Sequence, residues 1–346
     1  MSVLKLNCFA SIIISFFSVN LQLYFVVLLR NLKPTRKKVP IEDLIMALLS
    51  TTDFPLKIEK RDGFSHGRID LHSHTSCSDG SLSPQTLLDR AVNYQIDVLA
   101  ITDHDTLAGL DIAQRYINEQ NVPITLISGV EISTAWQGFE IHIVGHNFDK
   151  NNDQLQQLIV DQQQARELRA ITIGEKLAKC GFPDAYEDAK KSAGEGSITR
   201  AHFAKVLLQQ GHVSTMQKAF DLYLGKKGRN TQKAYVKPTW CSIEQAVNTI
   251  HVAGGSAVMA HPIRYDLSAK WLRRLIVHFK ECDGDGLEIV LPQMNPQQRQ
   301  TMLNYCLEYD LHASTGSDFH HPNKWSDLGR NLILPDGATP VWALWT

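Results

Sequence analysis

Blocks of apolar residues alternate with polar segments over most of the chain, and they predict strands and helices in turn. A short apolar run at 68–71 predicts a strand. Ser83 and Pro84, a capping residue and a first-turn proline, then predict a helix to about Tyr94. The segment DVLAIT at 97–102 predicts a second, buried strand. Further strands are expected at 124–131, 140–145, 256–260, 286–289 and 312–314, and further helices at 106–119, 242–253, 269–280 and 296–309. Strands that alternate with helices predict parallel βαβ units.

The alternation is interrupted between residues 149 and 235. Long polar helices replace it there, and the segment ends in the basic, glycine-containing loop GKKGRNTQKAY. We interpret 149–235 as a helical insertion, which leaves 67–148 and 236–346 as one α/β domain. The length of the chain, 346 residues, suits one large domain with an insertion.

The first sixty-six residues differ from the rest. The run Phe9–Leu29 is almost wholly apolar and is followed by positive charges at Arg30, Lys33, Arg36, Lys37 and Lys38. Its length could span a bilayer with the basic flank on the cytoplasmic side. A start of translation placed too early, or a buried or disordered tail, are the alternatives. A secretory signal is disfavoured because no small-residue cleavage site follows.

Charge and cysteine content exclude some classes of protein. A formal net charge of -1 excludes strong non-specific binding of nucleic acid through the total charge of the protein, although a local basic cleft is compatible with it. The six cysteines form no CxxC pair, so neither a disulfide framework nor a cysteine zinc site is indicated. A reducing, cytoplasmic compartment is the simpler expectation.

Histidines and carboxylates recur where the predicted strands end. The candidates are His72, His74, Asp79, Asp103, His104, Asp105, Glu131, His142, His261, Asp318 and His320. In a parallel barrel the carboxyl ends of the strands converge on one face, where active sites are built. Residues two apart in a strand point the same way, so His72 and His74 can hold one ion together. A single HxH pair is as often structural, and we expect His66, His146, His212, His278 and His312 to be ordinary core or surface residues.

The number and kind of these side chains predict a cluster of metals. Imidazole and carboxylate ligands without thiolate suit manganese, zinc or iron. The set exceeds the needs of one ion, so two or three ions are expected. Clustered metals can activate water and clamp a phosphoryl group.

The motifs DLHSHTSCSDG, ITDHDT, GVEIS, EIHIVG, AHP and GSDFH resemble, in order, those of the PHP (polymerase and histidinol phosphatase) family of metallo-phosphoesterases. The resemblance covers about Arg68 to the carboxyl terminus. The stretches SITRAHFA, AYVKPTWCSIEQAV and HPIRYDLSAKWL are similar to a bacterial subgroup of 5′–3′ exoribonucleases (RNase AM type) and 3′,5′-nucleoside bisphosphate (pAp) phosphatases. The resemblance implies a distorted (β/α)7 barrel with a small helical insertion, and up to three metals, commonly Mn²⁺.

The resemblance also implies how the ligands are shared. His72, His74, Glu131 and Asp318 would hold the first metal, and Glu131 would bridge to a second held with His142 and His261. Asp79, His104 and His320 would hold a third metal or touch the substrate phosphate, and they are the candidate catalytic residues. Asp70 and Asp103 would orient ligands from behind.

The implied reaction is hydrolysis of a phosphoester by a metal-activated hydroxide. A histidine, His104 or His320, or metal-bound water would protonate the leaving oxygen. We expect Cys77 to be a packed residue rather than a nucleophile. A second phosphate on the substrate needs a cationic subsite, for which the candidates are Arg166, Arg169, Arg200 and Arg264. For Arg166 and Arg169 a solvated helix face is the alternative.

Further contacts with a nucleotide are less specific. Tyr235 or Trp240 could stack a base, although Trp240 fits a core as well. Lys226, Lys227 and Arg229 could follow an RNA backbone or form a solvated loop. The expected substrates are RNA 5′ ends, as in the trimming of ribosomal RNA precursors, and small bisphosphorylated nucleotides, with no protein partner indicated. A histidinol-phosphate type of phosphatase, a non-catalytic PHP module and a membrane-tethered partner protein are the alternatives.

Overall fold

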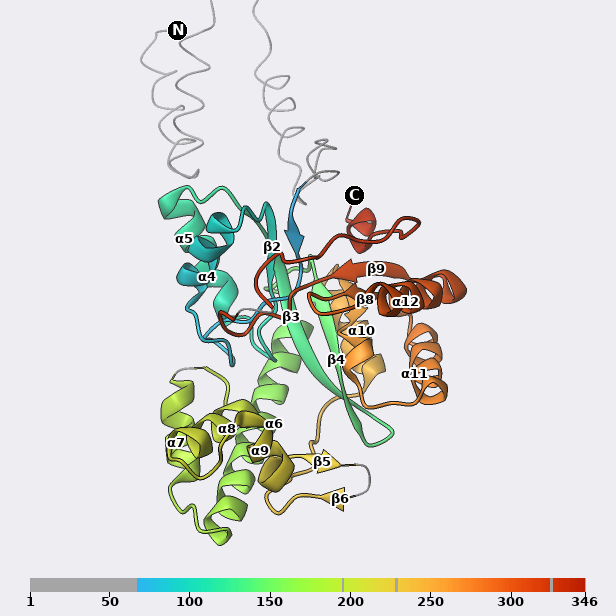
Figure 1. The fold of residues 1–346 in the computed structure, drawn as a ribbon. Helices are drawn as coiled ribbons and strands as arrows, with labels where there is room; N and C mark the ends of the chain where they lie inside the picture. The colour runs from blue at the N-terminus through green and yellow to red at the C-terminus, as the bar shows by residue number, and fades with distance from the viewer. Residues whose placement is uncertain (1–66, 195, 228–229, 324–325, 346) are drawn as a thin grey trace, which may run out of the picture. The chain divides into compact units, whose positions relative to one another are not determined.

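The computed structural model describes residues 67–194, 196–227, 230–323 and 326–345 (Figure 1). Seven strands form one sheet in the order β1-β2-β3-β4-β7-β8-β9. Their bounds are β1 Ile69–Asp70, β2 Val98–Ile101, β3 Thr125–Trp136, β4 Phe139–His146, β7 Ser256–Met259, β8 Gly286–Val290 and β9 His312–Thr315. The predicted α/β fold with a nearly closed seven-stranded barrel is confirmed.

The two edges of the sheet meet and nearly close the barrel. Leu71 N donates to Thr315 O at 3.1 Å, and Asp318 N donates to His72 O at 2.9 Å. Ser73 and Phe319 form a parallel bridge just beyond the strands. The first and last strands are therefore joined at the ends that carry the histidines.

Helices cover the outside of the sheet. Their bounds are α4 Pro84–Asn93, α5 Ala108–Gln120, α10 Ile243–Val252, α11 Ala269–Glu281 and α12 Pro296–Tyr309. Each of four helices starts at a side chain that accepts a hydrogen bond from its first turn, namely Ser83, Ser242, Ser268 and Asn295. In α11 the buried residues Leu272, Leu275, Ile276 and Phe279 recur at helical spacing. Apolar faces of this kind fix the helices on the sheet.

The prediction of purely parallel units is wrong at β4. This strand runs antiparallel to β3 and to β7. Only Gln137 and Gly138 separate β3 from β4, and both have a positive φ, 50° and 83°. Positive φ at both central residues is the requirement of a type I′ hairpin turn, which leaves no room for a crossover helix. β3 also continues past its predicted end at Glu131, as far as Trp136.

The segment between β4 and α10 forms a separate group of helices. These are α6 Asp153–Lys179, α7 Ala185–Ala193, α8 Arg200–Gln209, α9 Met216–Ala219 and a π-helix at Phe220–Leu224, followed by the short strands β5 Lys226–Lys227 and β6 Asn230–Thr231. Ile173, Leu177, Phe203 and Leu207 belong to an apolar cluster of their own. The limits 149–235 for an insertion domain stay a prediction.

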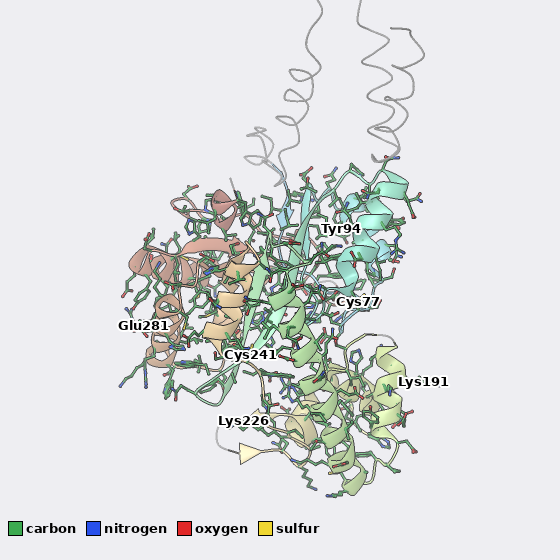
Figure 2. The ribbon with its side chains drawn as sticks, turned by 180° about the vertical axis from the view of Figure 1, so that it is seen from behind. Cys77, Tyr94, Lys191, Lys226, Cys241 and Glu281 are labelled. Atoms are coloured by element: carbon green, nitrogen blue, oxygen red, sulfur yellow. The ribbon has the colours of Figure 1, made fainter. Side chains whose placement is uncertain are left out.

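This helical group is tied to the barrel at the face that carries the histidines. Gln162 Nε2 donates to Ser133 O at 2.6 Å, and Ser197 N donates to Cys77 O at 3.2 Å. Figure 2 shows Cys77 and Cys241 along this junction, with Lys226 and Lys191 on the helical group. The loop after β1 is thereby covered by the helical group.

Two further expectations concern the amino-terminal segment and the cysteines. Within the described ranges no helix is long and apolar enough to cross a bilayer. The run Phe9–Leu29 lies outside the described residues, and so does Cys8. Among the described residues, Cys180, Cys241, Cys282 and Cys306 are free thiols.

Candidate metal centre

The two histidines of the first motif lie side by side and share the same carboxylates. Nε2 of His72 lies 3.1 Å from Nε2 of His74. Both nitrogens lie within 3.4 Å of Asp318 Oδ1 and within 3.3 Å of Glu131 Oε2. The four side chains could hold one metal ion, as the sequence predicts.

Glu131 is the centre of the cluster and is fully buried. Besides His72 and His74, its carboxylate contacts His104 Nδ1 at 3.1 Å, His142 Nδ1 at 2.8 Å and His261 Nε2 at 3.0 Å. Burial alone would raise the pKa of Glu131, but the surrounding histidines outweigh it and hold the pKa well below its usual range. An ionised carboxylate between several imidazoles can bridge two metals.

A third group lies beside the first two. Asp79 faces His320 at 3.3 Å, His104 at 3.9 Å and His74 at 4.0 Å. All four could hold one ion together. The resemblance implies that Glu131 is shared between two metals. In the structure His74 and His104 also belong to two groups each. The structure thus brings all nine predicted ligands together, and their partition among ions stays a prediction.

The nitrogen and oxygen atoms of this cluster are better suited to ligate metal ions than to hydrogen-bond with one another. Five buried atoms have no hydrogen-bond partner, namely His74 Nδ1, Asp79 Oδ1, His104 Nδ1, Glu131 Oε2 and His261 Nδ1. Burial lowers the pKa of His104 to about 3, so its imidazole is neutral and can ligate a metal. Buried polar atoms without partners are costly, and cations placed among them would satisfy them.

Two ligands are presented by strained backbone at the strand ends. His261 has a φ of 32° and Asp318 a φ of 50°, values in the left-handed region that few residues other than glycine adopt. His261 N donates to Glu288 Oε2 at 2.7 Å, and Asp318 N donates to His72 O at 2.9 Å. These hydrogen bonds hold both residues in place, as is common where strain serves a site.

Glu288 is a functional candidate that sequence reasoning missed. It lies inside β8, where its Oε1 lies 3.1 Å from His72 Nδ1 and its Oε2 accepts from His261 N. It thereby fixes the ring of His72 with Nε2 aimed at the other ligands. The available signal was a charged residue within the otherwise apolar strand GLEIV.

Asp70 and Asp103 accept hydrogen bonds from loop residues and not from the imidazole rings of the candidate ligands. Asp70 accepts from Ser317 N at 2.8 Å and from Gly329 N at 2.9 Å. Asp103 accepts from the backbone and side chain of Thr75 and from Ser78 Oγ, at 2.6–2.7 Å. Their contacts support the loops that carry Asp318 and Asp79.

The predicted arginines surround the site, but each already contacts a carboxylate. Arg166 Nε donates to Asp105 Oδ2 at 2.6 Å, and Arg264 pairs with Asp318. Arg169 and Arg200 both pair with Glu140, at 3.1 and 2.8 Å. A phosphate would therefore have to compete with Glu140 for this pair.

The other predicted nucleotide contacts divide between core and surface. Trp240 is buried and donates from Nε1 to Glu140 Oε1 at 2.8 Å, while the guanidinium groups of Arg166 and Arg169 lie over its ring. It is therefore a packed residue here. Lys226 donates to Gly138 O at 3.1 Å. Arg229 and the side chain of Lys227 lie outside what the structure describes.

Known proteins share these motifs and this fold. Residues 70–160 match the family model described as PHP domain. The chain is 48% identical over 275 residues to a 5′-3′ exoribonuclease of Haemophilus influenzae, covering 80% of this chain and 98% of that one. It is 35% identical over 278 residues to a 3′,5′-nucleoside bisphosphate phosphatase of Chromobacterium violaceum, covering 79% of this chain and 95% of that one. A solved structure of an amidohydrolase from Chromobacterium violaceum with bound sulfate superimposes with a TM-score of 0.73 at 34% identity, covering 80% of this chain and 95% of that one. The chain belongs to the PHP family.

Proposed function

We propose that this PHP hydrolase is a metal-dependent phosphoesterase that removes nucleotides from the 5′ end of RNA and also hydrolyses 3′,5′-nucleoside bisphosphates such as pAp. The observation that carries the proposal is the cluster around Glu131, in which buried histidines and carboxylates have unsatisfied donor atoms. The relatives named as an exoribonuclease and a bisphosphate phosphatase support the choice of substrates.

The cluster would hold two or three divalent ions, for which we propose Mn²⁺, with zinc or iron as alternatives. Such ions supply the Lewis acidity that neutralises the phosphoryl group and activates water. We assign His72, His74, Glu131, Asp318, His142 and His261 to ligation. Asp79, His104 and His320 would complete the ligand set or touch the phosphate.

His320 is the better candidate for the proton donor to the leaving oxygen. Its side chain is 29% exposed, compared with 11% for His104, so it can reach a bound substrate. Burial would lower the pKa of His320, but Asp79 and Asp318 raise it to about 10. If His320 touches the phosphate and is not a ligand, it would hold a proton that it can donate.

Arg169 and Arg200 would bind the second phosphate of a bisphosphate or the next phosphate of an RNA chain. Both lie beside the metal cluster on helices of the inserted segment, and two guanidinium groups that converge on one carboxylate also suit a phosphate. We propose that the enzyme acts in the cytoplasm and trims ribosomal RNA precursors. The free thiols of Cys180, Cys241, Cys282 and Cys306 suit a reducing compartment.

The test is hydrolysis of pAp and of a short 5′-monophosphorylated RNA in the presence of manganese. Asp318→Ala should lose both activities, because Asp318 contacts both histidines of the first motif, whereas Asp161→Ala on the exposed side of α6 should keep both. If the wild type hydrolyses neither substrate, the nucleotide proposal is wrong and a phosphatase for a small metabolite of the histidinol-phosphate type replaces it.

A further inference from the structure

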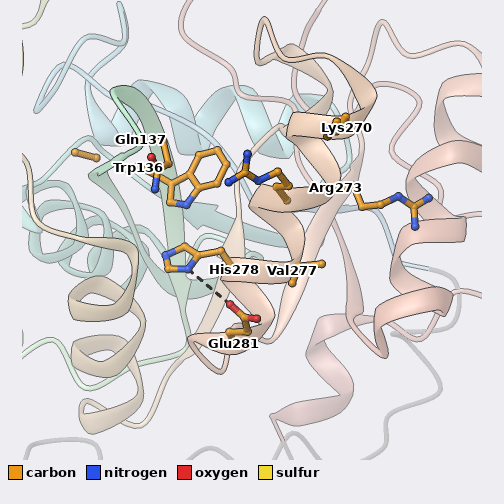
Figure 3. Close-up of a pocket in the computed structure, with 9 residues that line it drawn as sticks. Trp136, Gln137, Lys270, Arg273, Val277, His278 and Glu281 are labelled. Atoms are coloured by element: carbon orange, nitrogen blue, oxygen red, sulfur yellow. Dashed lines mark ion pairs between the residues drawn. The ribbon is translucent and has the colours of Figure 1, made fainter.

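A groove lies on the outside of the barrel, between α11 and the tip of the β3–β4 hairpin. Its volume is about 670 Å³, and Trp136, Gln137, Lys270, Arg273, Arg274 and His278 line it (Figure 3). We call it the α11 groove. None of these residues belongs to the metal cluster.

The charge of the α11 groove is predominantly positive, although the chain as a whole is near neutral. Lys270 and Arg274 are exposed and form no ion pair with any residue that the structure describes. Arg274 is fixed over the ring of Trp271, 4.6 Å from its centre. Among the described lining residues Glu281 is the one carboxylate, and it pairs with His278 at 4.0 Å. Two uncompensated cations thus remain for an anionic ligand.

The chain itself leads from the metal cluster to the α11 groove. Arg264 contacts the metal-ligand candidate Asp318 and is 42% exposed, so it marks the edge of the site. Lys270 follows Arg264 by six positions, a span of at most about 20 Å. Tyr265, between them, accepts at its hydroxyl a hydrogen bond from His142 N at 2.8 Å, which fastens this connection to the site. Arg264, Lys270 and Arg274 therefore mark a basic path that starts at the candidate catalytic centre.

We propose that the α11 groove binds the phosphate backbone of the RNA downstream of the nucleotide being removed. This inference rests on the proposed exoribonuclease function. Lysine and arginine side chains that neutralise phosphates supply affinity without reading sequence, which suits an enzyme that shortens RNA one nucleotide after another. A single bisphosphorylated nucleotide held at the metal cluster would not depend on the groove, because no lining residue of the groove is among the candidate ligands. The groove thus separates long substrates from short ones.

The test compares Lys270→Ala/Arg274→Ala with the wild type on three substrates: pAp, an RNA dinucleotide and an RNA of about 12 nucleotides, within the range that single-strand binding surfaces cover. The variant should keep its kcat/KM on pAp and on the dinucleotide. Its KM for the longer RNA should rise roughly 3- to 30-fold, and the salt dependence of binding should weaken by about 0.7 in log-log slope for each phosphate that the variant no longer neutralises. Arg115→Ala/Lys191→Ala, which removes the same charge from exposed positions on α5 and α7, should leave both quantities unchanged.

Binding of the longer RNA with a 5′-hydroxyl end, measured by fluorescence anisotropy in EDTA, gives a readout without catalysis. If the variant binds this RNA as the wild type does, and degrades the substrate of about 12 nucleotides with an unchanged KM, the groove proposal is wrong and the proposed function stands. If the wild type cleaves no RNA and the double substitution lowers RNA affinity, the exoribonuclease function is wrong, and what stands is that the groove binds an RNA backbone.

Discussion

Glu288 and His72 are 216 positions apart in the chain, yet Oε1 of Glu288 lies 3.1 Å from Nδ1 of His72. A carboxylate in this position fixes the tautomer of the imidazole and raises its basicity. Because Glu288 also accepts from His261 N, one side chain inside β8 positions two ligands of the metal cluster.

Glu288→Gln should weaken metal binding by about 10- to 100-fold, because the amide keeps the shape of the carboxylate but loses its charge. Calorimetric titration with Mn²⁺ measures this effect. Glu244→Gln, at an exposed position of α10, is the matched control. Unchanged affinity in Glu288→Gln would mean that the contact to His72 has no influence on the ligands.

Gly316→Ala should abolish activity and metal binding together. A Cβ at this position would come 2.2 Å from His72 Cβ and 2.5 Å from Glu288 Oε1, so the ligand ring would have to move. Activity on pAp, the Mn²⁺ affinity and circular dichroism should be measured on the same sample. Gly211→Asn serves as control, because nothing lies within 4 Å and asparagine tolerates a φ of 75°. A fully active Gly316→Ala would contradict the close packing described here.

Glu140→Gln should destabilise the free protein, and pAp should restore much of the loss. Burial would raise the pKa of Glu140, but Arg200 and Arg169 outweigh it and keep the pKa well below its usual range, so the carboxylate is charged. Removing one partner of a largely buried charge cluster costs about 3–5 kcal/mol. A phosphate can then take the place of the missing carboxylate.

Thermal unfolding with and without pAp measures this effect. Asp111→Asn removes an exposed pair with Lys150 and should shift the melting temperature little, with or without the ligand. Equal shifts by pAp in wild type and Glu140→Gln would show that the two arginines do not bind substrate phosphate.

His251 should contribute stability in mildly acidic solution. Its hydrogen bond to Asp285 at 2.7 Å raises its pKa above the usual value, despite some opposing burial. A group whose pKa is raised by folding contributes fully below the unfolded pKa of about 6.5 and loses its contribution as the pH rises through the folded pKa. The free energy of unfolding of wild type should therefore exceed that of His251→Gln most at about pH 6 and less at about pH 8. His212→Gln is the control, and a difference that grows with pH would contradict this assignment.

The nine candidate ligands could be selected from the sequence because each follows or lies within a recognisable strand, and parallel strands bring their carboxyl ends together. Their ligation of metal stays a prediction. The sequence does not predict Glu288, since a residue inside a strand shows its importance only through the two partners that reach it from distant segments. The pairing of Arg169 and Arg200 with Glu140 was missed for the same reason. The reversal of β4 was readable in principle, because even the eight residues between the predicted strands 124–131 and 140–145 are too few for a crossover between parallel strands.

That reversal makes the metal cluster sensitive to chain length at one place. Glu131 and His142 project to the same side because Ser133 is opposite His142 across the β3–β4 pair. A single residue inserted at Gln137 or Gly138 would shift this register and turn His142 to the opposite face. Loops between the parallel strands can vary in length without altering any register. We therefore expect insertions and deletions among functional homologues to accumulate in those loops and to be absent from this two-residue turn.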